Sequence, residues 1–232
     1  MVDEERLQVC RVCGGRQFRT QQILWPSLVE AWQLAPHEAE YINRQQGKYC
    51  TQCGANLRSM VLAQAILNHV GYEGCLTEFV ASRTAKRLTV LEVNRAGNLT
   101  AVLAAMPGHV LREYPECDMM RLDVPGGSVD LVVHSDTLEH VEDPVRGLSE
   151  CRRVLSPGGA CCFTVPIVVD RLSRSRAGLP DCHHGAAEKT RSDLTVRTEF
   201  GYDVWKYVIA AGFSRCALEV LEYPAGIALT AR

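Results

Sequence analysis

The chain has 232 residues, 47% of them apolar and 22% charged, and its 25 basic and 27 acidic side chains give a formal net charge of −2. This length can bury one sizeable core, and it fits a main α/β domain with a small appended module better than two full domains. The near-neutral charge argues against the basic surfaces that bind nucleic acid or anionic membranes, so we expect neither as a partner.

Cysteine usage predicts the compartment. The chain has eleven cysteines. Because this number is odd, the chain is long, and Cys161 and Cys162 lie in an apolar, strand-like run, a secreted disulfide scaffold is the weaker interpretation. No apolar run approaches the length of a membrane span, and the first residues, MVDEERLQVC, are too acidic for a signal peptide. We therefore expect reduced thiols and a cytoplasmic location.

Two C-x-x-C pairs lie near the N-terminus, and a glycine directly follows each of them. The pairs are Cys10 with Cys13 and Cys50 with Cys53. Thiolates at this spacing chelate one tetrahedral metal ion, and the glycine lets the backbone turn tightly around the sulfurs. We expect a closed, structural four-cysteine zinc site in a module of residues 1–54. Four unrelated buried cysteines, or redox-active pairs, are the alternatives. Between the pairs, Pro36 and Gly47 are expected to begin and end a short helix.

The remaining chain, residues 55–232, alternates between helix and strand patterns. We expect helices at 56–70, 98–106, 144–156 and 202–213, and strands at 87–94, 109–114, 128–135 and 159–169, with a C-terminal antiparallel pair at 215–223 and 226–231. Gly71 should end the first of these helices, and Asp143 should cap the third, with Pro144 at its first position. This alternation predicts an α/β fold: a Rossmann-like, doubly wound, mainly parallel sheet with an antiparallel C-terminal strand. Ligands of such sheets bind beyond the carboxyl ends of the strands.

One segment carries a family resemblance. The run SVDLVVHSDTLEHVEDPVRGLSECRRVLSPGG, residues 128–159, closely resembles the central motif of class I methyltransferases that depend on S-adenosylmethionine (SAM), of the small-molecule group called type 11. The resemblance extends from about Arg87 to the C-terminus. It implies SAM as the cofactor and in-line transfer of its methyl group to a small-molecule acceptor.

The family's first motif, E/D-x-G-x-G-x-G, is altered in this chain. Glu92 holds the acidic position, where it can hold the SAM ammonium or orient the loop. The cofactor-binding positions that follow are Asn94, Ala96, Gly97 and Asn98. Ala96 adds only one methyl group, and asparagine tolerates left-handed backbone angles better than most residues, so SAM binding remains compatible with this loop. A non-catalytic, zinc-stabilised module that has lost SAM binding is the alternative.

Three further residues are assigned to the cofactor from the resemblance. Glu113 lies 21 residues after Glu92 and is expected to hold the ribose hydroxyls, with Glu116 as a substitute. Asp118 aligns with the acid that faces the adenine amino group, and Met119 is expected to pack on the ring.

The interval between Glu113 and Asp118 carries a structural prediction. A parallel crossover needs a dozen or more residues, whereas only residues 114–117 are available. We therefore expect the sheet to lack the usual third strand at this edge. The adenine side is then either exposed or covered by the zinc module.

Two histidines are candidate catalytic residues. His134 closes a predicted strand close to where SAM should lie, and we also count it among the cofactor contacts. His184 lies in the segment 168–200, where the family builds a lid over its substrate, and it is the preferred general base. His140, in the L-E-H-V turn, is expected to pack structurally.

The lid segment also holds Arg171, Arg174 and Arg176. Such a cluster can hold a phosphate or carboxylate of the acceptor, for example of a nucleotide-linked sugar, and a solvated charged surface is the alternative.

Overall fold

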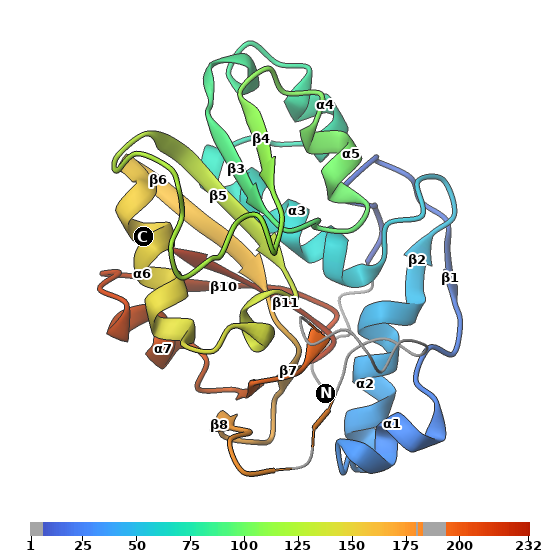
Figure 1. The fold of residues 1–232 in the computed structure, drawn as a ribbon. Helices are drawn as coiled ribbons and strands as arrows, with labels where there is room; N and C mark the ends of the chain where they lie inside the picture. Colours follow the sequence, from blue (N-terminus) through green and yellow to red (C-terminus); the bar gives the residue numbers. More distant parts are fainter. Residues whose placement is uncertain (1–6, 180, 183–193) are drawn as a thin grey trace.

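The computed structural model describes residues 7–179, 181–182 and 194–232, which form a six-stranded central sheet and two smaller ones (Figure 1). In spatial order the strands of the central sheet are β10 (Cys216–Leu221), β11 (Gly226–Ala231), β6 (Leu155–Thr164), β5 (Val129–Ser135), β3 (Val90–Val93) and β4 (His109–Arg112). The last four are parallel to one another, whereas β11 pairs antiparallel with β6 and β10 antiparallel with β11. The predicted fold class is therefore confirmed.

Helices cover both faces of this sheet (Figure 1). One face carries α3 (Leu57–Val70), α4 (Leu76–Val80), the 3-10 helix η1 (Ala85–Arg87) and α5 (Leu99–Leu103), and the other carries α6 (Pro144–Val154) and α7 (Trp205–Ala210). Side chains of β5 alternate between the two layers: Leu131 and Val133 pack in the core with α3, and Val132 packs in the core with α6. Two-sided burial explains why consecutive residues are apolar in β3 and in the Leu131–Val133 run of β5.

The helix ends follow the capping pattern of the sequence. The Asn56 side chain accepts a hydrogen bond from the amide of Ser59 at the start of α3, and Gly71 ends this helix in a left-handed conformation. Asp143 caps α6 in the same way by accepting from the amide of Arg146, with Pro144 at the first position. Both predicted starts and the predicted stop of α3 are confirmed.

The strand after α6 differs from its prediction. It begins at Leu155, before the Pro157-Gly158-Gly159 sequence rather than after it. A bulge accommodates this turn-forming sequence, because Val129 of β5 pairs with Leu155 whereas Leu131 pairs with Ala160. The strand then ends at Thr164, shortly before Pro166, and the chain resumes as β7 (Ile167–Val168).

The sheet ends at β4, as the short interval after Glu113 predicted. Residues after β4 form turns, in which the amide of Cys117 donates to the carbonyl of Glu113 and Asp118 forms a single bridge to Arg121. Val110, in the middle of β4, is 37% exposed. Of the two predicted alternatives, an adenine side that is exposed and not covered by the zinc module therefore agrees with the structure.

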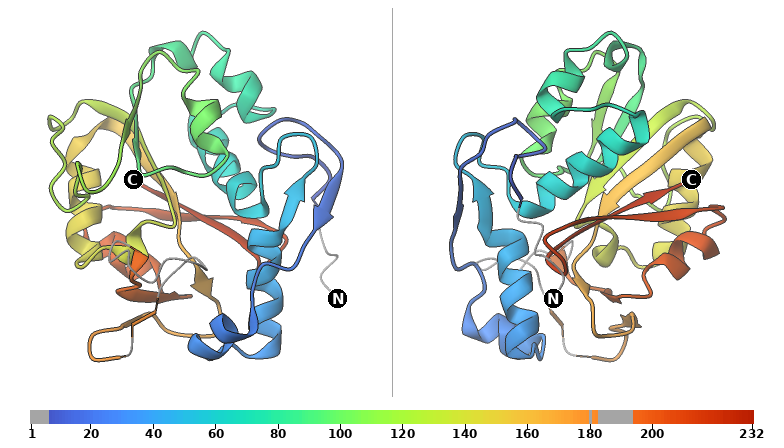
Figure 2. Two further views of the ribbon diagram at one scale, coloured as in Figure 1. Left: turned by 45° about the vertical axis from the view of Figure 1, so that its right-hand side comes forward. Right: turned by 180° about the vertical axis from the view of Figure 1, so that it is seen from behind.

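The N-terminal segment lies beside the central sheet (Figure 2). It contains β1 (Phe18–Thr20), α1 (Pro26–Ala31), α2 (Pro36–Gly47) and β2 (Lys48–Cys50), with β1 and β2 antiparallel. The helix between the cysteine pairs thus has the predicted ends. Tyr41 and Ile42 of α2 share one hydrophobic core with Leu57 and Met60 of α3. The boundary at residue 54 stays a prediction, and the two parts pack as one body.

The predicted lid segment contributes a second small sheet. Its described residues include β8 (Arg174–Ser175) and β9 (Thr198–Gly201), and β9 pairs with β7 on one side and with β8 on the other. In the part of the chain that the structure describes, every helix is too short or too polar to cross a bilayer.

Candidate functional site

The two cysteine pairs meet in space with matching backbone geometry. Gly14 and Gly54 are both left-handed, with φ of 78° and 73°, and each donates its amide to the carbonyl of the cysteine four residues earlier at 2.8 Å. The four sulfurs lie within 4.8 Å of one another, with 3.7 Å between Cys10 and Cys53 and 3.7 Å between Cys13 and Cys50. A tetrahedron with Zn–S bonds of about 2.3 Å has edges of about 3.8 Å, so the four thiols have the geometry of a zinc site.

A cleft of about 610 Å³ lies beyond the carboxyl ends of β3, β4 and β5. This is the place where open α/β sheets bind their ligands. Of the predicted cofactor residues, the cleft wall contains Asn94, Glu113, Asp118 and Met119. The volume is sufficient for a nucleoside-sized ligand.

Asn94 takes the place of a motif glycine without loss of the required backbone conformation. Its φ is 57°, which asparagine adopts more readily than most residues. Its amide donates to the carbonyl of Arg112, and its side-chain oxygen accepts from the amide of Tyr114 at 2.9 Å. Asn94 therefore joins the loop after β3 to the end of β4.

Glu92 orients this loop from beneath. Its side chain is fully buried and lies outside the cleft wall. One oxygen accepts from the amide of Ala96 at 2.7 Å and from the hydroxyl of Thr100, and the other lies 2.7 Å from Nε2 of His109. Of the two predicted roles, the structure supports orientation of the loop.

The other loop residues also lie outside the cleft wall. Ala96 is buried, whereas Gly97 and Asn98 are exposed. A Cβ on Gly97 would approach Ser59 and Arg58 of α3, and the Asn98 amide lies 3.5 Å from the carbonyl of Cys53. This half of the loop therefore faces α3 and the second cysteine turn, and the expectation that its side chains contact the cofactor is not supported.

Glu113 lies at the end of β4, as predicted for the ribose acid, and it has a partner there. Both of its oxygens accept from Arg95, at 3.0 and 3.1 Å, and the carboxylate is 41% exposed. Asp118 accepts from the amide of Met120 at 2.8 Å, and Met119 is buried. Glu116 is exposed and lies outside the cleft wall.

His134 does not lie in the cleft. Its ring is fully buried, stacks on Phe163 at 4.7 Å, and lies near the thiols of Cys151 and Cys161. Burial lowers the pKa of His134 to about 3, so the ring stays neutral. Its expected position next to SAM was wrong because the side chain at the end of β5 turns inward under α6. The preferred base, His184, lies outside the described residues.

The lid arginines have acidic partners from other parts of the chain. Arg171 pairs with Glu38 of α2, and both Arg174 and Arg176 pair with Glu199 of β9. Two carboxylates distant in sequence therefore pair with the three arginines that were considered as a site for a phosphate or carboxylate of the acceptor.

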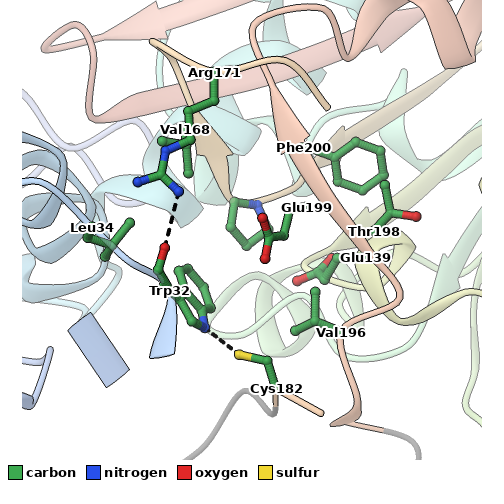
Figure 3. Close-up of a pocket in the computed structure, with 11 residues that line it drawn as sticks. Trp32, Leu34, Glu139, Val168, Arg171, Cys182, Val196, Thr198, Glu199 and Phe200 are labelled. Carbon is green, nitrogen blue, oxygen red and sulfur yellow. Dashed lines mark hydrogen bonds between the residues drawn. The ribbon is translucent and has the colours of Figure 1, made fainter. Parts of the chain in front are cut away.

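Arg171 also helps to close a small pocket between α1, α2 and the lid (Figure 3). In it, the indole of Trp32 donates to the sulfur of Cys182 at 2.6 Å, and Arg171 donates to the carbonyl of Trp32 at 3.1 Å. The pocket holds only about 20 Å³, which is room for about one water molecule. It is a packed interface and not a substrate site.

The cleft contains functional candidates that the sequence analysis missed. Asp136 and Thr137 follow β5, and His140 lies in η2 (Leu138–His140). Nδ1 of His140 lies 3.1 Å from the carbonyl of Thr195, which can only accept, so Nδ1 carries a proton and donates it. Arg197 also lines the cleft and is exposed. The signal for Asp136 and His140 was their place just after a strand end of a parallel sheet.

Comparisons with known proteins match parts of this chain to methyltransferases. Residues 60–163 match the model of a family described as a methyltransferase domain, of type 11. A probable S-adenosylmethionine-dependent methyltransferase of Mycolicibacterium smegmatis is 39% identical over 67 residues, which cover 27% of this chain and 26% of that protein. A ubiquinone biosynthesis O-methyltransferase of Nitrosococcus oceani is 29% identical over 92 residues, which cover 39% of each chain.

The chain thus matches about a quarter to two fifths of the length of these curated relatives. Among solved structures, a SAM-dependent methyltransferase from Aquifex aeolicus is 13% identical, with a TM-score of 0.40, over 67% of this chain and 87% of that one. Residues 60–163, which are 104 of the 232 residues, are thus similar to a methyltransferase domain, and the curated relatives with the matching segments are SAM-dependent methyltransferases or an O-methyltransferase.

Proposed function

We propose that the protein transfers the methyl group of SAM to a small-molecule acceptor bound in the cleft. The observation that carries this proposal is the placement of Asn94 and Glu113 in the wall of a cleft large enough for SAM. Asn94 accepts from the amide of Tyr114 and Glu113 accepts from Arg95, so both side chains join the loop after β3 to the end of β4. SAM supplies an activated methyl group on a sulfonium, so the protein mainly has to hold, align and dehydrate the reactants.

Each part of SAM has a candidate contact in the cleft. Glu113 would accept hydrogen bonds from the ribose hydroxyls, Asp118 would face the adenine amino group, and Met119 would pack on the ring. Asn94 would hold the loop open, with its backbone next to the methionine half. Glu92 and His109 would fix this loop from the side away from the ligand.

His140 is the residue best placed to remove a proton from the acceptor. The carbonyl of Thr195 accepts from Nδ1 and so orients the ring, and Glu139 Oε1 lies 3.7 Å from Nε2. Arg197 offers a cation to an anionic group of the acceptor. A sugar or nucleotide-linked sugar, acted on in the cytoplasm, is consistent with these groups.

We propose further that Cys10, Cys13, Cys50 and Cys53 bind one structural zinc ion. The sulfur separations agree with a tetrahedral shell, and four thiolates leave no coordination position for a water molecule or a substrate. The ion would therefore hold the N-terminal segment in place without taking part in methyl transfer.

Calorimetry with SAM and with its demethylated product, S-adenosylhomocysteine (SAH), tests the proposed activity. We expect saturable binding of both, since the cleft and its acids are preformed. Zinc-replete protein that binds neither compound would contradict the proposal. That result would favour the alternative, a zinc-stabilised module that has lost SAM.

Two substitutions test the ribose contact. Glu113→Ala is expected to lower SAH affinity by about 10- to 100-fold, because hydrogen bonds to a charged group contribute about 1.5–3 kcal/mol. Arg95→Ala is the matched control. This variant removes the ion-pair partner of Glu113 and keeps Glu113 itself. Because the ion pair is exposed, SAH affinity should change by less than about fivefold. Equal effects of the two variants in calorimetry would contradict the assignment of Glu113.

A further inference from the structure

We propose that Asp136 recognises the acceptor beside the methyl group that is transferred, and that the N-terminal segment holds Asp136 in position through Gln46. The acceptor class that fits is a small molecule with a hydroxyl or amino group next to the methylated atom. This inference rests on the proposed function and adds a specificity-determining residue to it.

The position of Asp136 follows from the strand order. Glu113, the proposed ribose contact, ends β4 on one side of β3, and Asp136 follows β5 on the other side. β3 and β5 are in register, with Glu92 opposite Val133, so their carboxyl ends lie next to each other. A SAM molecule with its ribose at β4 crosses the end of β3 and brings its sulfonium towards the end of β5. Asp136 lines the cleft there.

The backbone of Asp136 is in a conformation that needs support. Its φ is 46°, in the left-handed region that non-glycine residues adopt infrequently and mostly where the surroundings enforce it. The support is a hydrogen bond from its amide to the carbonyl of Thr164 at 3.0 Å. Such conformations cluster at functional sites.

The side chain of Asp136 is held on three sides and retains room for one more donor. Oδ2 accepts from Arg58 and from the side-chain amide (Nε2) of Gln46, the latter at 3.2 Å, and Oδ1 accepts from the hydroxyl of Thr164 at 3.3 Å. A carboxylate has about four acceptor positions, so these described partners leave one, on Oδ1. The side chain is 13% exposed, which gives a ligand access from the cleft.

Gln46 connects this carboxylate to the cysteine site. It lies near the end of α2, and its side-chain oxygen accepts from Asn56 at 3.2 Å. Asn56 is the capping residue of α3 and comes directly after the second cysteine turn. The N-terminal segment therefore contributes a positioning residue to the acceptor side of the cleft, in addition to its packing on α3.

A carboxylate with one open acceptor position binds O–H and N–H groups. His140 would take the proton of the accepting atom, so Asp136 would bind a second donor beside it. Vicinal hydroxyls, as in sugars, present this pair of groups. An acceptor without a second donor would leave the open acceptor position on Oδ1 of Asp136 desolvated and without a hydrogen bond.

Sinefungin tests this inference without knowledge of the acceptor. This SAM analogue carries a primary amine, protonated at neutral pH, in place of the methylated sulfonium, so its ammonium lies where the methyl group would point. We expect Asp136→Asn to weaken sinefungin binding relative to SAH binding at least about tenfold in calorimetry, because a charge-assisted hydrogen bond is lost. Asparagine is a suitable replacement because it keeps the shape and tolerates the backbone angle.

Two further variants complete the experiment. Gln46→Ala should lower the relative affinity for sinefungin about two- to fivefold, because it loosens Asp136 without removing the charge. Glu142→Gln removes another acid of the same cleft and should change the relative affinity less than about twofold, since its exposed charge is screened.

An unchanged ratio of sinefungin to SAH affinity in Asp136→Asn and Gln46→Ala would overturn the inference and leave the proposed function intact. If Asp136→Asn binds neither compound, the ratio of sinefungin to SAH affinity in Gln46→Ala decides: a lowered ratio supports the inference, and an unchanged ratio overturns it. Binding of neither compound by the unaltered protein would overturn the proposed function, and the inference with it.

Discussion

Asn94→Val is expected to lower SAH affinity by roughly 100-fold or more, whereas Asn94→Gly should change it by less than about fivefold. The reason lies in the backbone: Asn94 has a φ of 57°, which glycine adopts freely and a β-branched residue adopts only at a cost of about 1–3 kcal/mol. Both replacements lose the acceptor for the amide of Tyr114, so the difference between them comes from the backbone strain of valine, which would shift the loop after β3 into the cleft. Calorimetry with SAH measures both variants.

Asn98→Val is the matched control for this pair. Asn98 lies in the same loop and is exposed, whereas Asn94 is half-buried, and the φ of Asn98 is −65°, so valine adds bulk there without backbone strain. SAH affinity should stay within about threefold. An equal loss in Asn94→Val and Asn98→Val would show that the loop tolerates no bulk anywhere, and binding of SAH by Asn94→Val as tightly as by the unaltered chain would contradict the role of this backbone curve.

The sheet could be predicted from the sequence because the signals for each strand and helix lie within its own residues. Apolar runs predicted the buried strands, Gly71 and Asp143 predicted helix ends, and the short stretch between Glu113 and Asp118 predicted the missing edge strand. The start of β6 was predicted wrongly from the Pro157-Gly158-Gly159 sequence. A bulge there depends on the pairing with the neighbouring strand and cannot be predicted from the residues of β6 alone.

The candidate site was harder to predict because its partners are distant in sequence. Strand alternation alone leaves open which face His134 occupies, and the structure turns it under α6. The acids that neutralise Arg171 and Arg174 come from α2 and β9. The carboxylate of Asp136 accepts hydrogen bonds from Gln46 and Arg58, which lie about 80–90 residues earlier in the chain. The resemblance to a family located the cleft, and the contacts that belong to this chain alone had to come from the structure.

Cys50→Ser is expected to remove bound zinc and to lower the melting temperature by about 5 °C or more. Cys50 is fully buried among the four sulfurs, and structural zinc contributes directly to folding free energy. Because α2 shares a core with α3, loss of order near Cys50 also weakens the packing of the sheet domain, and a loss of about 2 kcal/mol lowers the melting temperature of a domain this size by about 4–8 °C. Elemental analysis should give about one zinc per unaltered chain and none for the variant.

Two controls separate metal loss from the loss of a thiol. Cys216→Ser removes a half-buried cysteine from β10, remote from the cluster, and should keep the zinc. Gly15→Ala keeps all four thiols, but its Cβ would lie 2.9 Å from the sulfur of Cys50, closer than such atoms approach each other. It should therefore weaken zinc binding, measured by competition with a chelator, because the sulfur has to move from its tetrahedral position. Unaltered, reduced protein that contains no metal when freshly purified would contradict the zinc site itself, and full zinc affinity in Gly15→Ala would contradict the sulfur positions from which the tetrahedron was inferred.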